Sequence, residues 1–237
     1  MKKFFDKDEV WFAVVWIIIY VIGFANADSL SESIGIPKLL TVLFGFALAA
    51  ILYGFIQKHR LNRYFGLCAP TANRKAYLYY LPLIVISSVN LWCGVTPRAS
   101  FFEILLFILS MCFVGLLEEV IFRGFLFKGM CKSNVTTAII VSSLTFGAGH
   151  IVNLFLGEPV LDTLLQLVYA SAIGFCYTAL FHVSGSILPC ILSHAFVNST
   201  SIFAIAPSPT MQMIITAVQT ILSVGYGFWL LRKANTA

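Results

Sequence analysis

Three charged residues stand inside an apolar stretch of this chain: Glu118, Glu119 and Arg123 in the sequence LLEEVIFRGFLF. A charge at the centre of a membrane-spanning helix costs about 2.5–3.5 kcal/mol on an insertion scale, so such residues are compensated or functional. On an α-helix Glu119 and Arg123 share one face and can pair, while Glu118 points about 100° away. The spacing therefore predicts a buried ion pair beside a second carboxylate that stays available for chemistry. A purely structural ionic clamp is the alternative for this motif alone.

Two further apolar stretches carry polar residues. The sequence FGAGH ends at His150, and HAFVN places His194 and Asn198 four residues apart, on one helical face. With a rise of about 1.5 Å per residue, Glu118, His150, His194 and Asn198 lie roughly 12–22 Å below the basic end of their segments. We therefore expect antiparallel helices to bring the four residues to one level.

The composition requires that these segments lie in a membrane. Of the 237 residues 59% are hydrophobic and 11% charged, and the mean hydropathy is +0.93, which excludes an ordinary water-soluble domain. The net charge is +5, but the cations flank apolar segments instead of forming a basic stripe with aromatic residues, so nucleic-acid binding is not expected. The six cysteines are scattered without CxxC spacing and are predicted to be packing residues.

The elements that must position the polar residues are membrane helices. We predict an all-α, polytopic membrane helical bundle of about eight transmembrane helices, since each crossing needs about 20 apolar residues. The predicted spans are 10–25, 39–56, 77–95, 101–127, 135–156, 161–181, 186–205 and 211–231. They group into three N-terminal helices (1–100), a catalytic core (101–205) and a C-terminal helix (206–237), all within one compact membrane domain.

The distribution of Lys and Arg predicts the orientation. Cytoplasmic loops retain positive charge, so both termini are expected in the cytoplasm of a bacterial cell membrane. On that side lie twelve cations, against Lys38 and Arg98 outside: Lys2, Lys3, Lys7, Lys58, Arg60, Arg63, Arg74, Lys75, Lys128, Lys132, Arg232 and Lys233. A cleaved signal peptide ending at Ala25-Asn26-Ala27 is the alternative for the first span.

The segments EEVIFR, FGAGH and HAFVN, in this order, resemble the three signatures of the CPBP family, which includes CAAX prenyl endopeptidases and bacteriocin-processing enzymes. The resemblance covers about Phe101 to Ile205 and implies an eight-helix intramembrane peptidase. It implies that the first glutamate and first histidine act on water, and that the later histidine and asparagine face the oxyanion. The matching residues are Glu118, His150, His194 and Asn198, with Glu119 as a further catalytic residue and Arg123 and Phe146 as supporting residues.

These side chains are chemically suited to those roles. Glu118 and His150 could hold a water that loses its proton to the carboxylate, while His194 and Asn198 donate hydrogen bonds to the developing oxyanion. No metal or other cofactor is expected. Zinc is the alternative, because a His₂Glu set with an open position is a known catalytic site, although the HExxH motif is absent.

The sequence thus favours a membrane-embedded CAAX-type endopeptidase that cuts near the cytoplasmic side. Its expected partners are membrane lipids and a peptide or protein substrate, with or without a lipid anchor. The first alternative is a non-proteolytic bacteriocin-immunity or scaffold protein that binds a peptide or a partner membrane protein. A small transporter, whose charges would line an ion route, is a weaker alternative because no internal repeat is visible.

Overall fold

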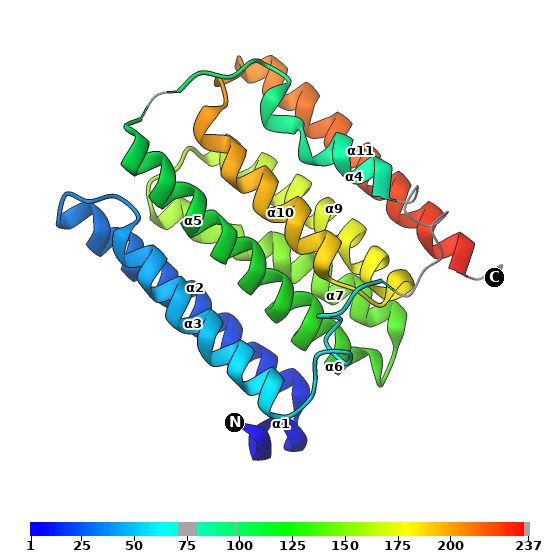
Figure 1. The fold of residues 1–237 in the computed structure, drawn as a ribbon. Helices are drawn as coiled ribbons and strands as arrows, with labels where there is room; N and C mark the ends of the chain where they lie inside the picture. The colour runs from blue at the N-terminus through cyan, green and yellow to red at the C-terminus, as the bar shows by residue number, and fades with distance from the viewer. Residues whose placement is uncertain (71–79, 98, 235–237) are drawn as a thin grey trace.

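Long apolar helices make up most of the computed structural model, which describes residues 1–70, 80–97 and 99–234 (Figure 1). Within these residues, six helical segments are long and apolar enough to cross a membrane: Glu9–Ser33, Leu39–Lys58, Phe101–Cys131, Val135–Phe155, Val160–Ser184 and Pro209–Lys233. The prediction of an all-α membrane bundle is therefore confirmed.

The other two predicted spans differ from expectation, so the number eight is only approximate. Span 186–205 contains a shorter apolar helix, Leu188–Phe203, made of α10 (Leu188–Thr200) and the 3₁₀ turn η5 (Ser201–Phe203). Span 77–95 begins in residues outside the described part and continues as α4 (Leu81–Ser87) and the 3₁₀ turn η2 (Val89–Leu91). Pro189 lies in the first turn of α10, where proline suits a helix start because its missing N–H has no intrahelical partner there.

Helix α5 (Phe101–Glu118) runs through the middle of the bundle, between α3 (Leu39–Lys58) and α10, and packs against both (Figure 1). The chain continues from α5 without a break into η3 (Glu119–Phe127), a π-helix whose nine residues are all buried. It packs against α2 (Glu9–Ser33) and α7 (Val135–Ala148). A membrane helix normally shows one face to lipid, so this burial on all sides makes η3 the centre of the core.

Beyond α7 the chain tightens into the 3₁₀ turn η4 (Gly149–Ile151) and the short helix α8 (Val152–Phe155). Helix α9 (Val160–Ser184) then packs between α7 and α11 (Pro209–Ala234). The short helices α1 (Lys2–Lys7) and α6 (Lys128–Cys131) lie before α2 and after η3. A hydrophobic core that extends from α1 to α10 surrounds η3.

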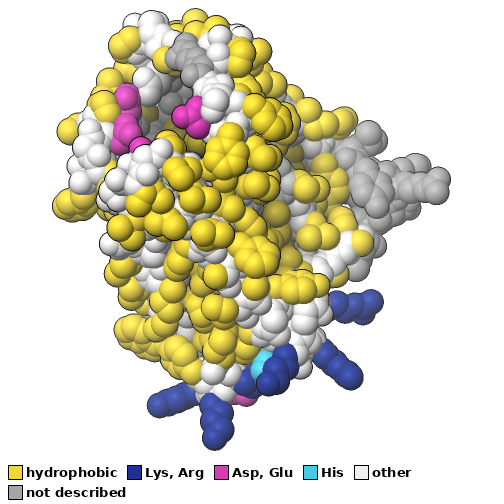
Figure 2. All heavy atoms as spheres, turned by 60° about the vertical axis from the view of Figure 1, so that its left-hand side comes forward, with side chains coloured by type: hydrophobic (Ala, Val, Ile, Leu, Met, Phe, Trp, Pro, Cys, Tyr) yellow, Lys and Arg dark blue, Asp and Glu magenta, His cyan; other side chains and the backbone are white. Residues whose placement is uncertain are grey.

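The two ends of the bundle differ in the sign of their charged side chains. Lys and Arg gather at one end, where α2 begins and α11 ends, while acidic side chains lie at the opposite end, beyond an apolar band (Figures 1 and 2). We call the first of these the basic end. Arg74, Lys75 and Arg98, three of the cations used to predict orientation, lie outside the described residues. The described cations at the ends of helices or in turns on the basic side are Lys2, Lys3, Lys7, Lys58, Arg60, Arg63, Lys128, Lys132, Arg232 and Lys233.

Candidate active site

Two glutamates and a histidine meet where α5 becomes the π-helix. His194 Nδ1, on α10, lies 2.9 Å from Glu119 Oε1, and its Nε2 lies 3.5 Å from Glu118 Oε2. Arg123 Nη1 donates a hydrogen bond of 3.0 Å to the same Glu119 Oε1. The predicted pairing of Glu119 with Arg123 is confirmed. The two carboxylates contact different nitrogens of one imidazole.

The Glu119–Arg123 pair is held in an aromatic enclosure. Both side chains are 0% exposed. The Arg123 guanidinium carbon lies 4.1 Å from the Phe146 ring centroid and 5.6 Å from that of Tyr177, distances at which a cation is attracted to the ring face. In the described part of the chain, the second Glu119 oxygen and two Arg123 nitrogens have no hydrogen-bond partner. The pair therefore depends on its mutual contact, on His194 and on the two rings.

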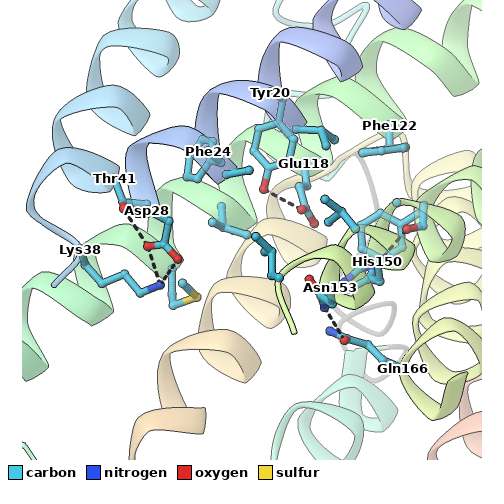
Figure 3. A pocket seen from close by; sticks show the side chains of 18 residues that line it. Tyr20, Phe24, Asp28, Lys38, Thr41, Glu118, Phe122, His150, Asn153 and Gln166 are labelled. Carbon is cyan, nitrogen blue, oxygen red and sulfur yellow. Dashed lines mark hydrogen bonds and ion pairs between the residues drawn. The ribbon is translucent and has the colours of Figure 1, made fainter. Parts of the chain in front are cut away.

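Glu118 has a partner that the sequence did not indicate. The hydroxyl of Tyr20, on α2, donates a 2.6 Å hydrogen bond to Glu118 Oε1, across 98 residues of sequence (Figure 3). This long-range contact satisfies one oxygen of Glu118, while the side chain still lines the cavity. The only indication in the sequence is that a tyrosine hydroxyl buried in an apolar span needs an acceptor.

Glu118 and His150 line one cavity of about 290 Å³, together with residues of α2, α3, α5, α7 and α9 (Figure 3). His150 lies in η4, and its Nδ1 is 3.2 Å from the Phe146 carbonyl oxygen. Because a carbonyl can only accept, Nδ1 carries the proton and Nε2 keeps a lone pair for another partner. Asn153 lines the same cavity and donates a 2.8 Å hydrogen bond to Gln166.

Phe146 connects the two histidines. Its ring contacts His150 and His194 edge-on, each at a centroid distance of 5.7 Å. His194 itself is not part of the cavity lining. Asn198 lies one turn further along α10 and is half-buried, and among the described residues its side chain has no hydrogen-bond partner. The structure thus brings Glu118, Glu119 and His194 together directly and places His150 on the shared cavity, whereas no hydrogen bond joins Asn198 to them among the described residues.

Local helix geometry departs from α at two of these positions. Glu119 begins a π-helix and His150 lies in a 3₁₀ turn. Short π and 3₁₀ segments within longer helices recur at functional sites, because they re-aim side chains that an α-helix would direct elsewhere. Both irregular segments contribute residues to the site.

Gly115 sets the distance between α5 and α10. A Cβ built on Gly115 would lie 2.7 Å from the backbone nitrogen of Ala195, which is closer than Cβ atoms approach in real proteins. Ala195 adjoins His194, and Gly115 lies one turn before Glu119. Only glycine at position 115 therefore allows the backbone approach that brings Glu119 to His194.

We expect Gly115→Ala to destabilise the protein by about 1–3 kcal/mol through overpacking. The matched control is Gly54→Ala on α3, where a Cβ meets nothing within 4 Å and alanine should stabilise the helix by about 0.5–1 kcal/mol. Thermal unfolding of both variants in detergent measures the difference. Equal unfolding midpoints for the two alanine variants would contradict the close approach at Gly115.

The positions of the possible donor atoms bear on whether the site could hold a metal. In residues 1–70, 80–97 and 99–234, no three side chains of His, Cys, Asp or Glu are grouped so that they could hold a metal ion. Each ring nitrogen of His194 faces a different carboxylate.

A comparison with known protein families finds a match in the middle of the chain. Residues 100–200 match the family described as type II CAAX prenyl endopeptidase Rce1-like. This segment contains both glutamates, Arg123, Phe146, both histidines and Asn198, whereas Tyr20 lies outside it. Searches of curated proteins and of solved structures found no significant match. Residues 100–200, which include the centre of the bundle, are thus similar to a family of membrane-embedded CAAX proteases.

Proposed function

We propose that this protein is an intramembrane endopeptidase in which Glu118 activates the attacking water. The observation that carries the proposal is the position of Glu118. One oxygen is fixed by Tyr20, the other lies 3.5 Å from His194, and the side chain lines a cavity shared with His150. A carboxylate so oriented, in a family of proteases, has the position required of a general base.

The proposed reaction begins with a water between Glu118 and His150. The carboxylate of Glu118 takes one proton as the water oxygen attacks the peptide carbonyl carbon, and the carbonyl oxygen becomes an oxyanion. Glu118 then returns the proton to the amide nitrogen as the C–N bond breaks, which leaves a carboxylic acid and an amine. The lone pair on His150 Nε2 is suited to accept the second hydrogen of the same water.

The oxyanion needs donors, and α10 supplies the candidates. Nδ1–H of His194 donates to Glu119, and Glu119 is in turn fixed by Arg123. For Nε2 of His194 to donate to the oxyanion as well, the ring must be in the imidazolium form. The group of Glu118, Glu119, Arg123 and His194 then has a total charge of zero. An electrically balanced group is the least costly to bury in hydrocarbon. Asn198 is half-buried and lies one turn later on α10. It would donate the second hydrogen bond to the oxyanion when a peptide is bound.

We further propose that this chemistry needs no metal and that the basic end faces the cytoplasm. The first proposal rests on the carboxylate partner that each ring nitrogen of His194 already has. The second rests on the gathering of Lys and Arg at the end where α2 begins and α11 ends.

Comparative peptidomics tests the function. Membranes and medium of cells that produce the wild type are compared with those that produce Glu118→Gln at equal levels. A peptide pair cut at one bond should appear only with the wild type. If the fragments are the same in both cultures while a partner process still depends on the protein, a binding or scaffold role replaces the proposal.

Tyr20 is proposed as a positioning residue, since it contacts Glu118 and not the substrate. We expect Tyr20→Phe to lower kcat by about tenfold with KM nearly unchanged, because the variant loses the free energy of one hydrogen bond to a charged group. In a Glu118→Asp background, whose shorter carboxylate no longer reaches Tyr20, the same change should have little further effect. The matched control is Tyr64→Phe, which removes a 2.7 Å hydrogen bond to Glu9 near the basic end. An equal loss of kcat in the Tyr20 and Tyr64 variants, or full additivity with Glu118→Asp, would contradict this role.

A further inference from the structure

The cavity has a buried inner end and an outer end. Tyr20, Phe24 and Asp28 line it from one face of α2, so it extends about 12 Å along that helix. Tyr20 and Glu118 form the inner end, and Asp28, Lys38 and Thr41 lie at the other end (Figure 3). Between them the wall is mostly apolar.

Exposure rises in the same direction. At the inner end Tyr20 is 6%, Phe122 3% and Phe146 4% exposed. At the outer end the side chains of Asp28 and Lys38 are 36% and 21% exposed, and Leu156, just after α8, is 57% exposed, whereas Thr41 is buried. The outer residues lie around the turn between α2 and α3 and just after α8. The cavity therefore opens at the end of the bundle that is opposite the basic end.

Lys38 stands at this opening in a conformation that a lysine rarely adopts. Its φ is +64°, in the left-handed region that favours glycine or asparagine, so the fold holds this side chain in place at some cost. Lys38 Nζ donates to both oxygens of Asp28, at 2.7 and 2.8 Å, and Thr41 donates to the same carboxylate at 3.0 Å. An ammonium has three donor hydrogens, so one remains for an incoming acceptor.

We propose that the peptidase site is entered from the extracytoplasmic face, and not from the cytoplasmic side that the sequence favoured, and that Lys38 receives carbonyl or carboxylate groups of the entering chain. The substrate class is then a peptide segment presented outside the cytoplasm, with apolar side chains beside the cleaved bond. This inference rests on the proposed function, which makes the cavity a peptidase site. It also rests on the charge asymmetry of the bundle, which orients the protein in the membrane.

Chemical labelling tests the entry side without any substrate. In a variant whose six native cysteines are replaced by alanine, single cysteines are introduced by Ala25→Cys in the cavity wall, Glu32→Cys at the α2–α3 turn and Arg63→Cys at the basic end. Sealed spheroplasts and inverted vesicles are treated with membrane-impermeant methanethiosulfonates, and unreacted thiols are counted with a fluorescent maleimide after denaturation. Monodisperse elution and thermal unfolding check that each variant is folded.

The Ala25 and Glu32 variants should react in spheroplasts, and the Arg63 variant only in inverted vesicles. Reaction of the Ala25 variant from the same side as the Arg63 variant, or from neither side, overturns the proposal. So does reaction of the Arg63 variant in spheroplasts. Because labelling needs no cleavage, a failure here is distinct from a failure of the peptidase proposal, which peptidomics would reveal.

The role of Lys38 is measured in the Ala25→Cys protein by comparing an anionic sulfonatoethyl reagent with a cationic trimethylammonium reagent. Lys38→Asn keeps a residue that tolerates the left-handed conformation but removes the charge. It should lower the anionic-to-cationic rate ratio by about threefold or more. Arg60→Asn is the matched control, because Arg60 also has a positive φ of +57° but lies toward the basic end. A ratio unchanged by Lys38→Asn, or lowered equally by Arg60→Asn, overturns this part of the proposal.

Discussion

Replacing Glu118 by glutamine is expected to lower kcat by about 10²- to 10⁴-fold while peptide binding stays nearly unchanged. The amide keeps the size of the carboxylate and can still accept the Tyr20 hydrogen bond, but it cannot take a proton from water. Single-turnover cleavage and equilibrium binding of the peptide found by peptidomics measure the two quantities separately.

Glu158→Gln is the control for the loss of one negative charge, since Glu158 is exposed in the turn before α9 and should affect neither quantity. Chelator treatment of the wild type should leave kcat unchanged, and elemental analysis of active protein should find no stoichiometric zinc. Activity that disappears on metal removal and returns with zinc would contradict the role of Glu118 as a metal-independent base. Glu119 would then be the first candidate for the base.

The largest effect on stability is expected from Arg123→Met. This change removes the arginine partner of Glu119, which has no exposure and keeps only its contact with His194, and breaking a buried pair costs about 3–5 kcal/mol. Chemical unfolding in mixed micelles measures the loss. Lys2→Met is the control, because the Lys2–Asp6 pair is largely exposed and its removal should cost less than about 1 kcal/mol.

The double variant Glu119→Gln with Arg123→Met separates charge from packing. With both charges removed, stability should recover most of the loss, while activity should stay low because His194 loses its charged partner. A double variant no more stable than Arg123→Met alone would mean that the aromatic enclosure of the guanidinium, and not the ion pair, stabilises this region.

The part of the site that follows from helical spacing could be predicted from the sequence. Glu119 and Arg123 are four residues apart, so any helix, whether α or π, keeps them close enough to pair. Depth along antiparallel spans likewise indicated that Glu118 and His194 would lie at one level. By contrast, nothing local specified the Tyr20–Glu118 contact, because it depends on how α2 packs against η3.

The irregular helices could not be anticipated either. Hydropathy reports whether a segment is apolar, not how many residues form each turn, so the π-helix after Glu118 and the 3₁₀ turn at His150 remain hidden in the sequence. The same limitation affected span 186–205, whose composition resembles a full crossing although its helix covers only Leu188–Phe203. The cavity opening was missed for a related reason. The opening depends on residues of the α2–α3 turn, such as Lys38, and in the sequence the charge of Lys38 indicates only how the protein is oriented in the membrane.

The hydrogen bond from Tyr20 bears on how such a protein can evolve. The segment 100–200 carries the family's residues, yet the group that fixes Glu118 and one wall of the cavity come from the first helices of the chain. Recombination that moved this segment into another membrane protein would transfer its signatures without that support. The N-terminal helices should therefore be inherited together with the core. A lineage that exchanged them would need a new hydroxyl opposite Glu118 to restore the position of this carboxylate.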